Sequence, residues 1–177
     1  MTTRLLNYFL HLSLIVSLLA CGEAQQQEKP QDSKLNTELS EAHAKFYKEH
    51  QEWLDEHRIF EEYFLYLKSK YVALNLEPVP RYDTLITQQD ELIRKHAMLI
   101  SDHLAFLDDH QLLIDKHRSG EVDDLEVEKR EKDVFKRHKD LEQQHDEMLK
   151  KYEVFNQEHE EMIRKAGGVV EPLKKSN

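Results

Sequence analysis

Histidine recurs at every seventh position through most of this chain, and this repeat limits what the chain can fold into. The stretch HLAFLDDHQLLIDKH carries His103, His110 and His117, and large apolar residues follow the first two at three and four places. Seven residues make almost two turns of an α-helix, so these histidines form one column on one helix face. Because apolar residues flank the column on both sides, we expect the imidazole rings in the centre of the buried stripe.

The few glycines and prolines divide the chain into three helical segments. The chain has four of each, and they fall mainly in 75–83, 117–124 and 166–172. Asp83 and Asp123 stand where helix N-caps are expected, and no long strand-like alternation occurs. The sequence therefore predicts an all-α fold, an antiparallel three-helix bundle that is similar to a coiled-coil hairpin, with helices at about 36–76, 83–118 and 123–165.

The histidine column continues through all three predicted helices with one heptad phase in each. If the two turns are centred near residues 80 and 120, column residues of neighbouring helices meet in layers. The predicted layers are Tyr71/Gln89/Tyr152, Phe64/His96/His145, His57/His103/His138, His50/His110/Glu131 and His43/His117/Asp124.

Two glutamates interrupt the apolar flanks of the column. Glu61 follows His57 by four residues, and Glu142 follows His138 by four residues. Both are predicted to point inward beside the layer of three histidines, where a carboxylate could bind a metal or orient a ring.

These layers predict a binding site for divalent transition metals. Three histidines, or two histidines and a carboxylate, are ligand sets of zinc, copper, nickel and iron. Successive histidines on one helix are about 10.5 Å apart, so a site must be assembled between helices. The candidate ligands are His57, His103, His138, Glu61, Glu142, His96, His145, His50, His110, Glu131, His43, His117 and Asp124.

A structural role for the same histidines is the alternative interpretation. Buried rings that bond one another and nearby polar groups would form a polar ladder, which fixes helix packing or senses pH and needs no metal. Haem is a weaker alternative, since the chain has no Cys-x-x-Cys-His sequence.

Charge and composition argue against several other functions. The formal net charge of −10 gives no basic surface for nucleic acid. The sequence shows no glycine-rich phosphate loop and no nucleophile beside a base, so we expect no catalytic residues and a protein that is not an enzyme.

The first residues have the layout of a secretory signal. Arg4 precedes an apolar run that ends directly before Cys21, the single cysteine of the chain. Leu18-Leu19-Ala20-Cys21 resembles the lipobox of bacterial lipoproteins. The resemblance implies removal of residues 1–20, a lipid on Cys21 as membrane anchor, and a place in the bacterial cell envelope, with the outer membrane favoured. An ordinary signal peptide with a free thiol, and an uncleaved anchor helix, stay open as alternatives.

The remaining chain divides into a polar tether at 21–35, the helical bundle at 36–166 and a C-terminal tail at 167–177. Besides the membrane, a second copy of the chain or another envelope protein is a candidate partner, because it could contribute a fourth helix to the three-helix bundle.

Overall fold

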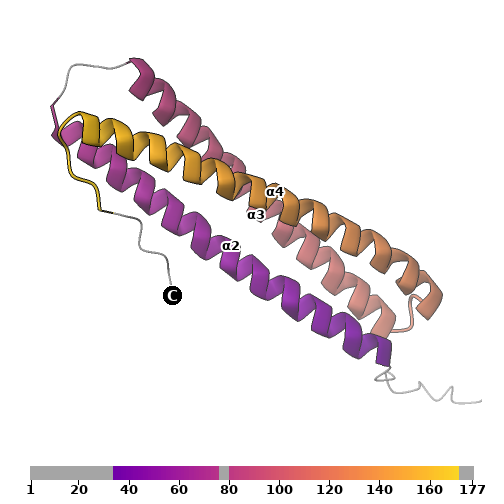
Figure 1. The fold of residues 1–177 in the computed structure, drawn as a ribbon. Coiled ribbons are helices and arrows are strands. Elements are labelled where there is room, and N and C mark those ends of the chain that lie inside the picture. Colours follow the sequence, from indigo (N-terminus) through magenta and orange to yellow (C-terminus); the bar gives the residue numbers. More distant parts are fainter. Residues whose placement is uncertain (1–33, 76–79, 172–177) are drawn as a thin grey trace, which may run out of the picture. The chain divides into compact units, whose positions relative to one another are not determined.

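The described part of the chain forms three long helices (Figure 1). The computed structural model describes residues 34–75 and 80–171, so the predicted signal sequence and Cys21 lie outside the described residues. The helices are α2 (Lys34–Ala73), α3 (Pro80–Arg118) and α4 (Asp124–Lys165). The described part contains no strand. The all-α three-helix bundle is therefore confirmed.

Two of the helix ends are built as the glycines predict. Gly120 and Gly167 both have positive φ, a conformation that favours glycine. Gly168 N–H donates to Ile163 O at 2.9 Å and Gly167 N–H donates to Arg164 O at 3.0 Å, the two bonds that close a helix C-terminus in a Schellman motif. Gly120 closes α3 in the same way, because Glu121 N–H donates to Lys116 O at 2.9 Å.

The starts of α3 and α4 differ in how well the sequence predicts them. Asp123 caps α4 as expected, since its carboxylate accepts from Glu126 N–H at 2.9 Å. Asp83 does not cap α3, which begins three residues earlier at Pro80. Proline fits the first helical position because its missing N–H needs no partner there.

This early start moves the predicted alignment of α2 and α3 by one heptad. Contacting rings pair His50 with His103 and His43 with His110, whereas the prediction paired His50 with His110 and His43 with His117. Because α2 ends and α3 begins about three residues earlier than predicted, the turn is centred earlier and each α2 residue meets α3 seven residues sooner. The contacting residue numbers rise along α2 and fall along α3, as in an antiparallel pair.

The predicted alignment of α3 and α4 is correct. His103 contacts His138 with ring centroids 5.3 Å apart, and His96 contacts His145 at 4.9 Å. At the far end His117 Nε2 lies 2.8 Å from Asp124 Oδ1. The short turn around Gly120 fixes this alignment. The prediction is correct because the predicted centre of the turn lies within the observed turn.

The central helix of the packing is α3. Both apolar flanks of its column are buried, including Leu99 with Ile100 and Phe106 with Leu107. In α2 and α4 one flank is less covered, and Tyr47, Leu54 and Phe135 are exposed although they follow column positions by four residues. The cause is that α2 and α4 approach each other less closely than either approaches α3.

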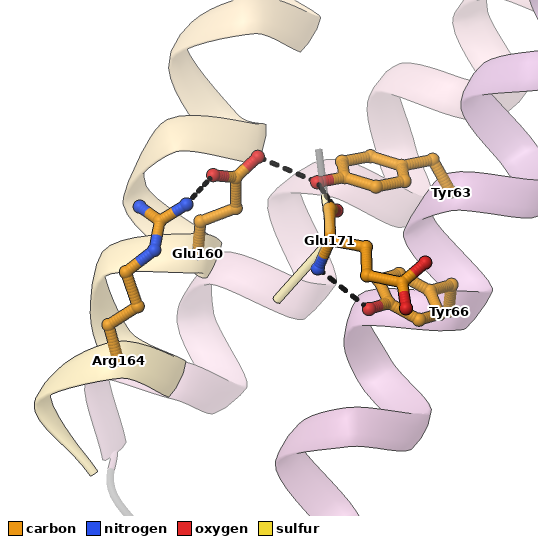
Figure 2. A network of polar contacts seen from close by, with 5 residues as sticks. All are labelled: Tyr63, Tyr66, Glu160, Arg164 and Glu171. Carbon is orange, nitrogen blue, oxygen red and sulfur yellow. Dashed lines mark hydrogen bonds and ion pairs between the residues drawn. The ribbon is translucent and has the colours of Figure 1, made fainter. Parts of the chain in front are cut away.

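The start of the predicted tail is packed against α2. Val170 packs beside the apolar cluster around Leu67, and Glu171 N–H donates to Tyr66 Oη at 3.0 Å (Figure 2). Tyr63 Oη lies 3.1 Å from Glu171 O and 2.7 Å from Glu160 Oε1. The segment after Gly167 thus holds the ends of α2 and α4 together. Among the described residues, no helix has the length and apolar character to cross a membrane.

Candidate functional site

Histidines of all three helices meet in two adjacent layers at the middle of the bundle. His103 lies between His50 and His138, with ring centroids 5.4 and 5.3 Å away. One heptad along, the second layer is His57/His96/His145, in which His96 has centroid distances of 5.0 Å to His57 and 4.9 Å to His145. The sequence predicted one layer of three histidines, and the structure has two.

The single tryptophan lies between these two layers. Trp53 stacks on His145 with centroids 4.1 Å apart and an interplanar angle of 8°, and its ring lies 4.3 Å from His103. Trp53 therefore contacts one ring of each layer, and its fluorescence reports on both.

The ring nitrogens of the two layers are buried and mostly lack hydrogen-bond partners. His96 and His103 are fully buried, and both nitrogens of His103 and Nε2 of His96 have no partner. His50 Nδ1, which is also buried, has none either. A buried polar atom without a partner costs about 1–3 kcal/mol. The two central layers are therefore sites at which a further ligand would relieve several unsatisfied atoms together.

In each layer, a glutamate of α2 contacts the histidine of α4. Glu49 Oε2 lies 2.8 Å from His138 Nε2, and Glu56 Oε2 lies 3.4 Å from His145 Nε2. Both histidine nitrogens, and Glu49 Oε2, nevertheless lack a partner with hydrogen-bond geometry. At 2.8 Å, the Glu49 and His138 atoms are within ion-pair distance. Each layer thus consists of three imidazoles and one carboxylate.

The ends of the column are closed polar networks. At one end His159 contacts Gln89 Oε1 at 3.3 Å and Tyr82 Oη at 3.0 Å, and the Gln89 amide donates to Asn156 Oδ1 at 2.8 Å. At the other end His117 lies 2.7 Å from Asn36 Oδ1 and 2.8 Å from Asp124 Oδ1. These histidines have their ring nitrogens occupied by protein groups, in contrast to the middle.

One mixed layer lies between the middle and the α3–α4 turn. His110 Nε2 is 3.4 Å from Glu131 Oε2, and the His43 ring centroid is 5.5 Å from that of His110. The sequence correctly placed Glu131 with His110. It paired them with His50, which lies instead in the central layer with His103.

Several predicted ligands are placed differently by the structure. His57 does not join His103 and His138, because the α2–α3 alignment is shifted by one heptad. Asp124 contacts His117 without His43 for the same reason. Glu61 and Glu142 are exposed and do not point inward. At equivalent positions Tyr47 and Leu54 of α2 and Phe135 of α4 are exposed as well, whereas Asn156 and Ile163 near the end of α4 are buried.

The carboxylates that do reach the layers were missed in the sequence. Glu49 and Glu56 directly precede His50 and His57. Two Glu-His pairs one heptad apart were the available signal. That signal was hard to interpret, because a residue next to the column normally projects beside the stripe. The loose α2–α4 packing is what brings these carboxylates to the histidines of α4.

Burial keeps the central histidines neutral. It lowers the pKa of His96 and of His103 to about 3, with further lowering by the neighbouring histidines. Burial also lowers the pKa of His145 to about 4. For His138 burial again lowers the pKa, although Glu49 and Glu142 oppose the effect. Neutral imidazole carries the free lone pair that a metal ion requires.

The candidate ligands lie close together, but they do not form a complete metal-binding site. In the described part of the chain, no three histidine, cysteine or acidic side chains already surround a point that could hold a metal ion. Individual pairs do fit: His57 Nδ1 and His96 Nδ1 are 3.3 Å apart. Two nitrogens bound tetrahedrally at 2.0–2.1 Å lie about 3.3–3.4 Å from each other. The same distance also suits a long N–H···N hydrogen bond.

Comparisons with protein-family models, with curated proteins and with solved structures gave no match for this chain.

The depressed pKa values predict loss of stability in acid. A histidine whose folded pKa lies below its ordinary value of 6.5 takes up a proton only when the chain unfolds. Its contribution to stability is therefore complete above about pH 6.5 and is lost as pH falls towards the folded pKa. Within this window each such histidine lowers the free energy of unfolding by about 1.4 kcal/mol per pH unit.

Urea denaturation between pH 7 and pH 5, followed by Trp53 fluorescence, measures this loss. The variant His96→Leu/His103→Leu should show a shallower pH dependence over the same range, since two of the titrating rings are absent. A wild-type stability that is level or rises towards pH 5 would contradict the prediction.

Proposed function

We propose that the bundle binds divalent transition-metal ions in its two central layers. Each ion would be held by imidazole nitrogens of one layer, His50/His103/His138 or His57/His96/His145, with the carboxylate of Glu49 or Glu56 as a further ligand. Imidazole and carboxylate donors suit zinc, copper, nickel and iron.

The observation that carries this proposal is the difference between the middle and the ends of the column. A polar ladder that only fixes packing would satisfy its ring nitrogens with protein groups, as His117 and His159 do. In the two central layers, Nδ1 of His50, Nε2 of His96 and both ring nitrogens of His103 are buried without a hydrogen-bond partner, and a carboxylate lies beside each layer. Unsatisfied polar atoms at the centre of a core destabilise it unless a ligand bonds them.

Binding would require small movements of the rings. Because no set of three ligands is already gathered among the described residues, the imidazoles must rotate about their side-chain bonds to share an ion. The pairs at 3.3 Å and 2.8 Å already have the separations of tetrahedral ligands, about 3.3 Å, and of adjacent octahedral ligands, about 2.9 Å.

A second candidate function is that of a structural, pH-responsive bundle without metal. The absence of a finished centre in the described residues favours it, and so do the closed networks at both ends of the column. In this case the buried neutral rings specify helix alignment, and protonation loosens the bundle in acid.

Metal titration of layer variants separates the two candidates. We expect the full chain in detergent to bind two Zn²⁺ or Co²⁺ ions, with a rise in Tm and a change in Trp53 fluorescence. His96→Leu and His103→Leu should each remove one ion, and the double variant should remove both. Leucine suits a coiled-coil column, so these variants should fold.

His159→Gln is the control, because His159 belongs to a closed network outside both layers, and it should keep two ions. A wild type that retains no ion, together with a His103→Leu variant of higher Tm, would exclude the metal and favour the structural candidate.

The two carboxylates should contribute to affinity without being essential for folding. Glu49→Gln and Glu56→Gln keep the side-chain size but remove the charge beside His138 and His145. We expect each to weaken the ion of its own layer about 10–100-fold, the usual effect of losing a supporting group at a metal site. Isothermal titration measures this loss, and Glu41→Gln, at an exposed position of α2, is the control. Equal affinities for all three variants would contradict the assignment of Glu49 and Glu56 as ligands of the two layers.

We further propose that this binding takes place in the bacterial envelope, with the bundle anchored by lipid on Cys21. The support is the resemblance of residues 18–21 to a lipobox. Expression in a bacterial host and mass spectrometry of the product should show an acylated N-terminal fragment beginning at Cys21. The Cys21→Ser variant should lack acylation and leave the membrane fraction. A wild-type product without lipid would reject the anchor.

A further inference from the structure

A groove runs along the less covered side of the bundle, between α2 and α4. It has a volume of about 700 Å³ and is lined by apolar side chains, among them Ile59, Phe60 and Leu149, and by charged side chains at its edges. Tyr63 and Glu160 line the groove. Both also belong to the polar network with Glu171 of the C-terminal segment, which Figure 2 shows.

The charged lining of this groove is acidic. Glu56, Asp146, Glu153 and Glu160 stand against a single lysine, Lys150. Glu52 is a further carboxylate whose charge acts on Glu56. Clefts lined by one sign of charge concentrate ions of the opposite sign and speed their association.

A second groove, between α3 and α4, has the opposite character. Its charged lining consists of Lys116, Arg130 and Arg137 against Asp109 and Asp133. This groove touches Phe106, which packs against histidines of the column, but its lining carries an excess of positive charge. Its basic side chains are ion-paired with acidic residues, so this groove lacks the acidic excess of the first.

The acidic groove is linked to a central layer through Glu56. This carboxylate lines the groove, and its Oε2 is 3.4 Å from His145 Nε2. The His145 side chain is buried, with 3% of the residue's surface exposed, and Nε2 has no hydrogen-bond partner. An unpaired buried nitrogen thus faces the carboxylate that forms part of the groove wall.

We propose that the α2–α4 groove is the entry port for divalent cations, which pass from the acidic edge formed by Asp146 and Glu153 to Glu56 and then to His145. This proposal rests on the metal-binding function proposed above. The port explains how an ion reaches a layer that three packed helices otherwise cover. Glu56 acts at the boundary, since it contacts both the groove and the ring.

The rate of Co²⁺ uptake tests the port, measured on the full chain in detergent by stopped-flow quenching of Trp53. The variant Asp146→Asn/Glu153→Gln removes two charges from the groove edge. Its matched control, Asp140→Asn/Glu147→Gln, removes two charges from exposed positions of the same helix outside the groove lining. We expect uptake about tenfold slower in the groove variant at low salt, with a smaller difference at 0.5 M NaCl, and within twofold of wild type in the control.

Narrowing the groove gives an independent measurement that does not depend on charge. Leu149→Phe keeps Trp53 as the single tryptophan and adds bulk to the groove floor. Because an ion enters and leaves by the same path, we expect uptake and chelator-driven release to slow by the same factor, with Kd unchanged.

The outcomes separate the port from the proposed function. A wild type that binds Co²⁺ while both groove variants take it up at the wild-type rate overturns the port and leaves metal binding intact. Equal slowing by the groove variant and its matched control also overturns the port, because general charge then explains the rate. A wild type that takes up no Co²⁺ overturns both proposals.

Discussion

The burial of imidazole rings on α3 is the constraint on which the rest of the structure depends. His96, His103 and His110 are fully buried on the helix that both other helices cover. A ring in this position cannot reach water, so its nitrogens depend on what α2 and α4 bring to them. The chemistry of the core is therefore decided by which residues of the outer helices lie opposite each α3 histidine.

The sequence was sufficient for the fold class, for the turns at Gly120 and Gly167, and for the α3–α4 alignment. Periodicity and glycine placement determine these features locally. The α2–α3 alignment could not be derived in the same way, because a histidine column repeats every heptad and looks nearly the same after a shift of seven residues. The start of α3 at Pro80 distinguishes the two alignments, and helix boundaries are the least certain part of sequence interpretation.

The sequence predicted that histidines of the three helices meet in the core, but the structure assigns them to different layers. The shift of α2 converts one layer of three histidines into two, and the unequal packing of the helices turns Glu61 and Glu142 outward. The same unequal packing admits Glu49 and Glu56 to the layers. Helix packing geometry, which heptad phase alone does not specify, thus selects the carboxylates.

The dissimilar groups at the two ends of the column have a consequence for the uniqueness of the fold. A uniform row of histidines would let α2 slide by one repeat at little cost in free energy, and the chain would populate several arrangements. Asn36 opposite His117, and Tyr71 stacked on Tyr82, occur at one repeat only and would be mismatched after such a slide. The interior can therefore remain chemically repetitive, because the molecule's single arrangement is specified at its tips.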